Sequence, residues 1–225
     1  MRYEGKPVAH PHLRNCRRNF FVLEASNLEC MRGSRRLFTD LAFRVEAGDS
    51  LLVQGANGSG KTSLLRTLAG LTPPATGEVR WNGCRIELLG NEYRRALLYC
   101  GHASALKDDL CALDNVMAST ALAGRPVALQ AAREALRQVG LKGRENLPVR
   151  VLSQGQKRRA GLARLLVDDS ALWILDEPLT ALDAGAVHWL AAVIDRHQAR
   201  GGMVVLTSHQ DVPLAKPAYA MRLGA

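Results

Sequence analysis

The sequence predicts an α/β fold whose core is a parallel sheet, with an N-terminal antiparallel β subdomain and an inserted α-helical subdomain. Two short, continuously apolar runs, 171–175 (ALWIL) and 203–208 (MVVLTS), are typical of strands buried on both faces of a parallel sheet. A helical pattern at 185–199 lies between them, and strands that alternate with helices indicate a sheet layered between helices. The first third of the chain is instead rich in strand formers separated by turn signals, which favours antiparallel pairing.

The strand-rich part begins with two segments of strand-forming residues, at 20–28 and 41–54. Residues 47–49 (AGD) mark a turn within the second segment, and its last residues lead directly into a glycine-rich stretch. A third segment, 78–86, contains Asn-Gly at 82–83 between two short strand-like runs, which is the strongest short-range hairpin signal.

Helices are predicted at three segments before residue 140. The first, 62–70, follows the glycine-rich stretch and ends in a glycine suited to a C-terminal cap. Further helices are predicted at 112–123 and 128–139. We therefore expect residues 102–165 to form a mostly helical subdomain between the strand-rich parts.

The size and charge of the chain limit its organisation. Its 225 residues suit one large domain with an inserted lobe, which we place at 21–225. Residues 1–20 are basic, and we expect them to be a disordered arm without a specific role, with a transit peptide or a lipid contact as alternatives. The net charge of +9 permits binding to nucleotides, acidic lipids or nucleic acid.

Membrane-spanning, secreted, disulfide-bonded and zinc-binding proteins are all disfavoured by what the sequence lacks. No apolar run approaches the roughly 20 residues that span a bilayer, and residues 1–20 have no apolar core of a secretory signal. The cysteines are odd in number and include no C-x-x-C pair, which favours free thiols in a reducing cytosol over a disulfide framework or a zinc site. They stand at positions 16, 30, 84, 100 and 111.

The glycine-rich stretch GANGSGKTS matches the phosphate-loop pattern G-x-x-x-x-G-K-[ST], with a strand before it and a helix after it. Glycines let backbone N–H groups wrap a triphosphate closely, and the start of the next helix adds its positive dipole end. Lys61 would reach the β- and γ-phosphates, and Thr62 would bind Mg²⁺. The alternative is a glycine turn before a helix. The expected nucleotide-binding residues are Gly55, Ala56, Asn57, Gly58, Ser59, Gly60, Lys61, Thr62 and Ser63.

Two acidic residues, Asp176 and Glu177, end the buried strand in LWILDEP. Because the carboxyl ends of parallel strands face the ligand crevice, we expect both side chains at the nucleotide. Asp176 can hold Mg²⁺ through water, and Glu177 can accept a proton from an attacking water molecule. The alternative is a solvated acidic turn.

A loop at 151–155 leads into a second helix whose N-terminus could bind an anion. Ser153 stands in the N-cap position of this helix, beside Gly155. One nucleotide needs one phosphate loop. The economical explanation is that this helix start serves a nucleotide bound to another subunit.

These motifs together resemble the ATP-binding cassette (ABC) ATPases over about residues 22–224. GANGSGKTS resembles their Walker A motif, LSQGQ their signature motif and LWILDEP their Walker B motif with its catalytic glutamate. TALD at 180–183 resembles the D-loop, and TSHQ at 207–210 the switch-histidine loop. The order of the motifs also agrees with the family.

The resemblance implies a P-loop NTPase fold and a head-to-tail homodimer with two ATP molecules between the subunits. Each ATP would lie between one Walker A motif and the signature residues Ser153, Gln154, Gly155 and Gln156 of the other subunit. Hydrolysis would need Mg²⁺ at Thr62 and Asp176. The resemblance assigns catalysis to Lys61, Glu177 and His209, and communication across the dimer to Asp183. For His209, the alternative is a histidine at a strand end without that role.

Two positions depart from the family pattern. The glutamine that normally binds Mg²⁺ at the start of the helical lobe aligns with His102, and the aromatic residue that stacks on adenine has Arg32 nearest to its place. A guanidinium can stack on a base through its planar face. Whether His102 contacts metal is left open.

The departures narrow the resemblance to the ATPase subunits of cytochrome c maturation transporters. This subgroup implies a peripheral protein at the cytoplasmic face of the inner membrane, with an integral permease of the CcmB type and with CcmC and the haem chaperone CcmE nearby. ATP hydrolysis would drive release of haem-loaded chaperone or export of a substrate. The alternatives are another ABC exporter, a soluble ABC ATPase acting on nucleic acid or ribosomes, and a protein that only senses ATP. No nucleic-acid partner is expected, because aromatic residues make up only 5% of the chain.

Overall fold

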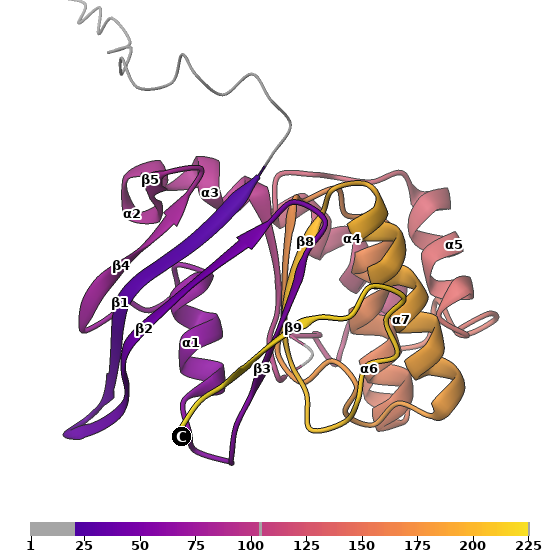
Figure 1. Cartoon of the computed structure of the whole chain (residues 1–225). Helices are drawn as coiled ribbons and strands as arrows, with labels where there is room; N and C mark the ends of the chain where they lie inside the picture. The colour runs from indigo at the N-terminus through magenta and orange to yellow at the C-terminus, as the bar shows by residue number, and fades with distance from the viewer. Residues whose placement is uncertain (1–20, 104, 225) are drawn as a thin grey trace, which may run out of the picture.

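Two β-sheets with one helix between them form the larger part of the molecule, as the computed structural model shows (Figure 1). The structure describes residues 21–103 and 105–224. The basic arm predicted at 1–20 lies outside these residues.

The smaller sheet is antiparallel and has the strand order β2-β1-β4-β5. The hairpin predicted from Asn-Gly is present, because β4 pairs with β5 through Trp81 and Cys84 on either side of that dipeptide. The turn between β1 and β2 was not predicted. The strands are β1 (Val22–Arg32), β2 (Arg35–Glu46), β4 (Thr76–Trp81) and β5 (Cys84–Arg85).

The larger sheet is parallel throughout and has the order β6-β7-β8-β3-β9. Together with the antiparallel sheet, it confirms the predicted fold class. The sequence predicted three of its strands and missed the first and the last in this order. The strands are β3 (Ser50–Gln54), β6 (Leu97–Cys100), β7 (Leu172–Leu175), β8 (Met203–Thr207) and β9 (Tyr219–Arg222).

The continuous apolar runs are explained by burial on both faces of the parallel sheet. Ile174 of β7 packs in the core that includes helix α1 (Lys61–Leu68) and the antiparallel sheet. Its neighbour Trp173 packs on the opposite face, against helix α7 (Ala184–Ala199). Full burial of such side chains contributes roughly 1.5–3 kcal/mol each, so a polar residue on either face of this strand would be costly.

A separate apolar cluster lies in the helical part of the chain, which Figure 1 shows on the far side of the parallel sheet from the antiparallel one. Helices α4 (Ala112–Leu122) and α5 (Leu129–Gln138) occupy the predicted positions. Residues 139–153 are mostly not α-helical, because their backbone bonds to the start of α4, as in Leu113 N–H to Glu145 O (2.9 Å). The remaining helices are α2 (Ile86–Leu89), α3 (Asn91–Ala96), η2 (Val149–Val151), α6 (Gln154–Leu162) and η3 (Ala163–Leu166).

Neither a membrane-spanning helix nor a disulfide is present in the described part of the chain. None of its helices combines the length and the apolar character needed to cross a bilayer. Its four cysteines, Cys30, Cys84, Cys100 and Cys111, are free thiols.

Candidate nucleotide-binding site

The phosphate loop connects β3 to α1 at the carboxyl end of the parallel sheet. Gly60, the residue before the helix, has a φ of 102°, a region that disfavours residues with a Cβ atom. A Cβ there would also lie 3.0 Å from Cβ of Leu37 and 3.1 Å from Cδ1 of Phe38. The antiparallel sheet therefore packs so closely on the loop that only glycine fits.

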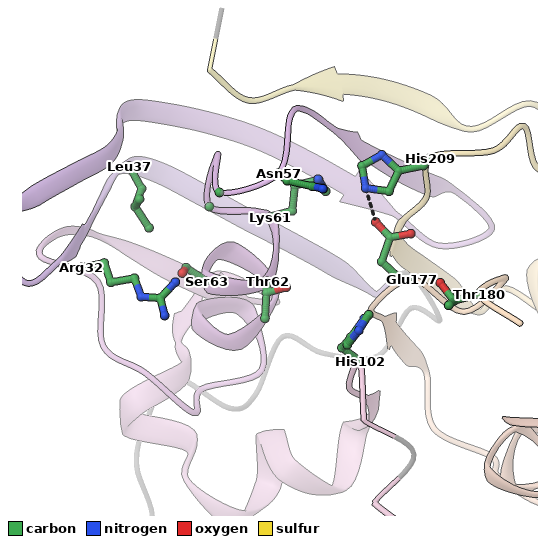
Figure 2. Close-up of a pocket in the computed structure, with 12 residues that line it drawn as sticks. Arg32, Leu37, Asn57, Lys61, Thr62, Ser63, His102, Glu177, Thr180 and His209 are labelled. Atoms are coloured by element: carbon green, nitrogen blue, oxygen red, sulfur yellow. Dashed lines mark ion pairs between the residues drawn. The ribbon is translucent and has the colours of Figure 1, made fainter. Parts of the chain in front are cut away.

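Lys61 begins α1 and folds back over the loop. Its Nζ donates hydrogen bonds to the carbonyl oxygens of Gly55 (2.8 Å) and Ala56 (3.3 Å), and the residue is only 8% exposed. The ammonium group thus lies within the loop, where the helix N-terminus already favours an anion. Figure 2 shows Thr62 and Ser63 in the same first turn of α1, also at the cleft.

The cleft beside the loop is open on one side and has a volume of about 480 Å³. The β1–β2 hairpin contributes Arg32, and the segments after β6, β7 and β8 contribute His102, Glu177 and His209 (Figure 2). The structure thus brings all four to the phosphate loop. Leu37 and Thr180 also line the cleft and were not predicted to do so. The complete lining is Arg32, Leu37, Asn57, Gly58, Gly60, Lys61, Thr62, Ser63, His102, Glu177, Thr180 and His209.

Asp176 is 1% exposed, and one of its two carboxylate oxygens is free for a further ligand. Thr207 Oγ1 donates to Oδ1 (2.9 Å), whereas Oδ2 has no hydrogen-bond partner among the described residues. Mg²⁺ prefers oxygen ligands, and its bound water molecules donate hydrogen bonds to carboxylates. The unpartnered oxygen of Asp176 and the hydroxyl of Thr62 therefore have the chemistry of a Mg²⁺ site, although Thr62 lines the cleft and Asp176 is not among the lining residues.

Thr207 was not predicted as a site residue, although it stands in the TSHQ motif. Strands β7 and β8 pair through Leu175 and Leu206, which places Thr207 beside Asp176. Its hydroxyl also accepts a hydrogen bond from Glu177 N–H (2.7 Å). One threonine therefore positions both acidic residues, a function that only the strand register reveals.

Glu177 has a left-handed backbone with a φ of 49°. This conformation costs a non-glycine residue about 1–2 kcal/mol, so the surrounding contacts must hold it in place. Its Oε1 lies 3.3 Å from Nε2 of His209 (Figure 2). A carboxylate and an imidazole thus meet at the edge of the phosphate loop, where a carboxylate can accept a proton from water.

The predicted signature residues lie on a different part of the surface. Ser153 caps helix α6: its hydroxyl accepts from Gln156 N–H (3.3 Å), and Gln156 Oε1 accepts from Ser153 N–H (3.0 Å). None of residues 153–156 lines the cleft. A Cβ on Gly155 would lie 3.1 Å from the carbonyl oxygen of Ala181, which explains the glycine by close packing on the predicted D-loop.

Asp183 has a structural role that the sequence did not suggest. It is the N-cap of α7, and its Oδ1 accepts from Ala186 N–H (2.8 Å). Its predicted role across a dimer stays a prediction.

Comparison with known proteins identifies the family. The family model described as ABC transporter matches residues 38–180. A "Cytochrome c biogenesis ATP-binding export protein CcmA" from Pseudomonas aeruginosa is 55% identical, covering 91% of this chain and 100% of the relative. The chain belongs to the ABC transporter family. A second protein of the same description, from Cupriavidus metallidurans, is also 55% identical, covering 91% of this chain and 98% of the relative.

Solved ABC transporter structures share the fold. An ATP-binding protein from Pyrococcus furiosus superposes with a TM-score of 0.78 at 24% identity, over 90% of this chain and 97% of that one. A structure of an "ATP binding subunit of ABC transporter" has a TM-score of 0.74 at 26% identity, over 84% and 79%. The family membership and the resemblance predicted from the motifs agree, and this ABC transporter subunit is an ATPase.

Proposed function

We propose that this ABC transporter subunit hydrolyses ATP to drive a cytochrome c biogenesis transporter. The observation that carries the proposal is 52–55% identity to three ATP-binding export proteins of cytochrome c biogenesis, along nearly the whole of this chain and of each relative. A transporter ATPase works with membrane partners and as a pair of cassettes. The geometry of the cleft supports a role for each of its residues.

The phosphate loop holds the triphosphate of ATP. Backbone N–H groups of residues 55–60, the N-terminus of α1 and the ammonium group of Lys61 all favour its negative charge. The planar guanidinium of Arg32, at the same cleft, is available to stack on the adenine ring. Thr62 and Asp176 hold Mg²⁺, which when bound neutralises charge on the phosphate oxygens.

Glu177 accepts a proton from the water molecule that attacks the γ-phosphorus. The water oxygen forms a bond to phosphorus, the bond from phosphorus to the ADP oxygen breaks, and ADP and phosphate leave. His209, held 3.3 Å from the Glu177 carboxylate, contacts the γ-phosphate. His102 lines the same cleft and stands where the family has its glutamine.

Two copies of the chain enclose two ATP molecules, each between one phosphate loop and residues 153–156 of the other copy. The exposed, capped start of α6, away from the cleft of its own chain, supports this arrangement. Asp183, at the N-cap of α7, communicates between the two sites.

The membrane partner is a permease of the CcmB type, with CcmC and the haem chaperone CcmE in the same complex at the cytoplasmic face of the inner membrane. Exposed apolar side chains on the helical subdomain support docking of a membrane subunit there. Leu110 is 38%, Leu147 42% and Val151 61% exposed.

Replacing Glu177 by Gln tests the hydrolysis mechanism and the dimer together. Glu177→Gln removes the proton acceptor but keeps the shape, so ATP should bind while turnover falls at least about 100-fold. The closed state should then accumulate as a dimer in light scattering. Lys61→Ala is the control: it should bind ATP weakly and stay monomeric. A monomer that hydrolyses ATP at the wild-type rate would refute the dimer, and wild-type turnover by Glu177→Gln would refute the role of the carboxylate.

Co-purification tests the biological role. The tagged subunit should be recovered from solubilised membranes together with an integral membrane protein, and the complex should be assayed for haem. Retention on nucleic acid resin in place of a membrane partner would support the alternative of a soluble ABC ATPase that acts on nucleic acid.

A further inference from the structure

Arg158 is a buried cation that the mechanism above does not use. It lies on α6, close behind the signature residues, and is only 7% exposed. No carboxylate lies within ion-pair distance of it in the described part of the chain. Desolvation by burial lowers the pKa of its guanidinium, while Asp176 and Glu177 act in the opposite direction. A guanidinium buried in this way needs hydrogen-bond acceptors.

Those acceptors are backbone carbonyl groups of the candidate active site. Nη2 donates to the carbonyl oxygens of Asp176 (3.1 Å) and Glu177, and Nε to that of Pro178 (3.3 Å). Nη1 donates to the carbonyl oxygens of His102 (3.2 Å) and Gly101 (3.4 Å). One side chain thus joins the segments that follow β6 and β7, using the planar fork that only arginine offers.

These contacts hold the strained backbone of Glu177. Its carbonyl oxygen accepts from Arg158, and its N–H donates to Thr207 Oγ1 (2.7 Å). The left-handed residue is therefore pinned on both sides of its Cα atom. Without the donor from Arg158, the peptide could relax toward an ordinary conformation and carry the carboxylate away from His209.

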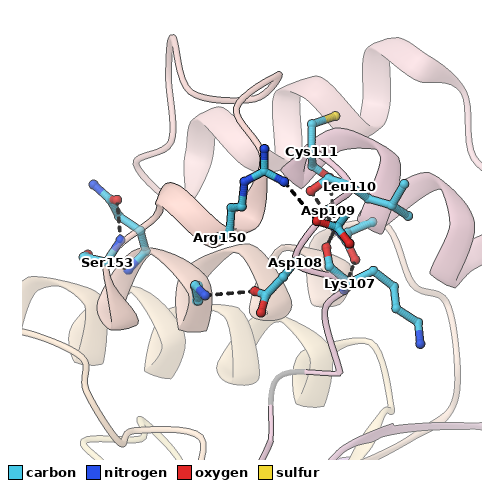
Figure 3. Close-up of polar contacts among 10 residues, drawn as sticks. Lys107, Asp108, Asp109, Leu110, Cys111, Arg150 and Ser153 are labelled. Atoms are coloured by element: carbon cyan, nitrogen blue, oxygen red, sulfur yellow. Dashed lines mark hydrogen bonds and ion pairs between the residues drawn. The ribbon is translucent and has the colours of Figure 1, made fainter.

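The same helix is also tied on its outer side. Lys157 Nζ donates to Asp108 Oδ1 (2.9 Å), and Arg150, just before the signature residues, pairs with Asp109 (2.9 Å; Figure 3). The Arg150–Asp109 pair is exposed and the Lys157–Asp108 pair partly so, and surface pairs of this kind contribute about 1 kcal/mol or less. The buried hydrogen bonds of Arg158 are therefore the stronger connection between α6 and the active-site backbone.

We propose that Arg158 is a positioning residue, which fixes the backbone of Glu177 and connects the signature helix to the catalytic carboxylate of its own chain. The inference rests on the proposed role of Glu177 and extends it. The start of α6 would contact the nucleotide of the other copy, so a shift of this helix would be transmitted to the backbone of Glu177 through Arg158.

Arg158→Lys tests this inference, because lysine keeps the charge but has three donors and no planar fork. The turnover number should fall about 10- to 100-fold, since a small displacement of a reacting group has effects of this size. The dissociation constant of a fluorescent ATP analogue should change less than about 3-fold, because the phosphate loop is intact. The matched control is Arg196→Lys, the same change at an exposed position in the last turn of α7, which should keep wild-type turnover.

A double-mutant cycle with Glu177→Gln separates positioning from general weakening of the fold. If Arg158 acts through the Glu177 carboxylate, Arg158→Lys should change the residual single-turnover rate of Glu177→Gln by less than about 2-fold. An equal 10- to 100-fold loss in both backgrounds, or a parallel loss of nucleotide affinity, would overturn the proposal. Wild-type turnover by Arg158→Lys would do the same. Wild-type turnover by Glu177→Gln alone would instead refute the proposed role of Glu177.

Discussion

At the scale of single residues, His197 is a buried titratable group far from the phosphate loop. Its ring stacks on Trp173, with centroids 3.7 Å apart and planes 3° apart. Burial, and secondarily the charge of Arg200, lower the pKa of His197 from its ordinary value of 6.5 to about 4. The folded protein therefore favours the neutral ring.

This shift makes the free energy of unfolding depend on pH. Above pH 6.5 the His197 ring is neutral in both the folded and the unfolded chain, so protonation of this group does not reduce the free energy of unfolding. As the pH falls from 6.5 to about 4, the unfolded chain binds a proton that the folded chain excludes, and about 3 kcal/mol of stability should be lost. Urea unfolding across this range should show the decrease. His197→Gln should have a shallower slope, and an unchanged slope would contradict the assignment.

The role of a residue could be predicted from the sequence where the residue belongs to a motif. It could not be predicted where the role depends on a contact that only the folded chain forms. Lys61 and Glu177 are given by their motifs, and the structure places both at one cleft. Thr207 and Arg158 act through strand register and through backbone carbonyl groups from distant segments. Nothing in the run KRR at 157–159 indicates that its middle residue is the buried one.

At the scale of elements, α6 depends on its cap. Helices of fewer than about 12 residues are marginal alone in water, and α6 has 9. The reciprocal bonds between Ser153 and Gln156 satisfy two backbone donors at its start. The residue predicted to contact the partner's nucleotide is thus also the one that keeps its own helix formed.

Ser153→Ala should therefore affect both the stability of the fold and, if Ser153 contacts nucleotide, the turnover of ATP. Loss of the cap should lower the free energy of unfolding by about 1 kcal/mol, whereas Ser153→Thr should retain most of it. Chemical denaturation of both variants measures this difference. If Ser153 also contacts nucleotide, ATP turnover by Ser153→Ala should fall under conditions where the variant is still folded. Equal stability of the Ala variant and the wild type would argue against a role for the cap.

Elements with a strong pattern were predicted, and weak ones were missed. The runs that became β7 and β8 are apolar throughout because both faces are covered. β6 is mostly half-buried and β9 mostly exposed, whereas β7, of the same length, is buried throughout, so neither β6 nor β9 has a continuous buried pattern. Residues 102–165 were expected to be mostly helical as a whole, with one helix ending at Gly140, but the sequence did not indicate that Pro148 pairs with Cys111 in an isolated bridge.

At the scale of the whole molecule, the helical subdomain has its own apolar cluster. Leu136 of α5 lies fully buried in it, together with Val116 of α4 and Leu141. The buried residues of the two clusters that contain the parallel sheet are different ones, and only the partly buried Leu166 and Trp189 pack against both the helical cluster and one sheet cluster. Damage to the helical cluster should therefore affect stability more than nucleotide binding.

Leu136→Ala should lower the free energy of unfolding by about 2–5 kcal/mol, because it leaves a cavity in a closed cluster. The matched control is Leu122→Ala on α4, where the side chain is 89% exposed and the change should be within about 0.5 kcal/mol. Affinity for a fluorescent ATP analogue should be unaffected in both folded variants. A large loss of affinity in Leu136→Ala would show that the subdomain and the phosphate loop are coupled.

The last strand, β9, holds in place the strand that leads into the phosphate loop. β9 pairs with β3 up to Gln54, and Leu223 N–H donates to the carbonyl oxygen of Gln54 (2.8 Å), one residue before the loop. A truncation ahead of Tyr219 would keep every motif from Gly55 to Gln210. It would also strip β3 of a neighbour and expose backbone donors and acceptors that recruit other chains, so a fragment chosen by its motifs alone should aggregate.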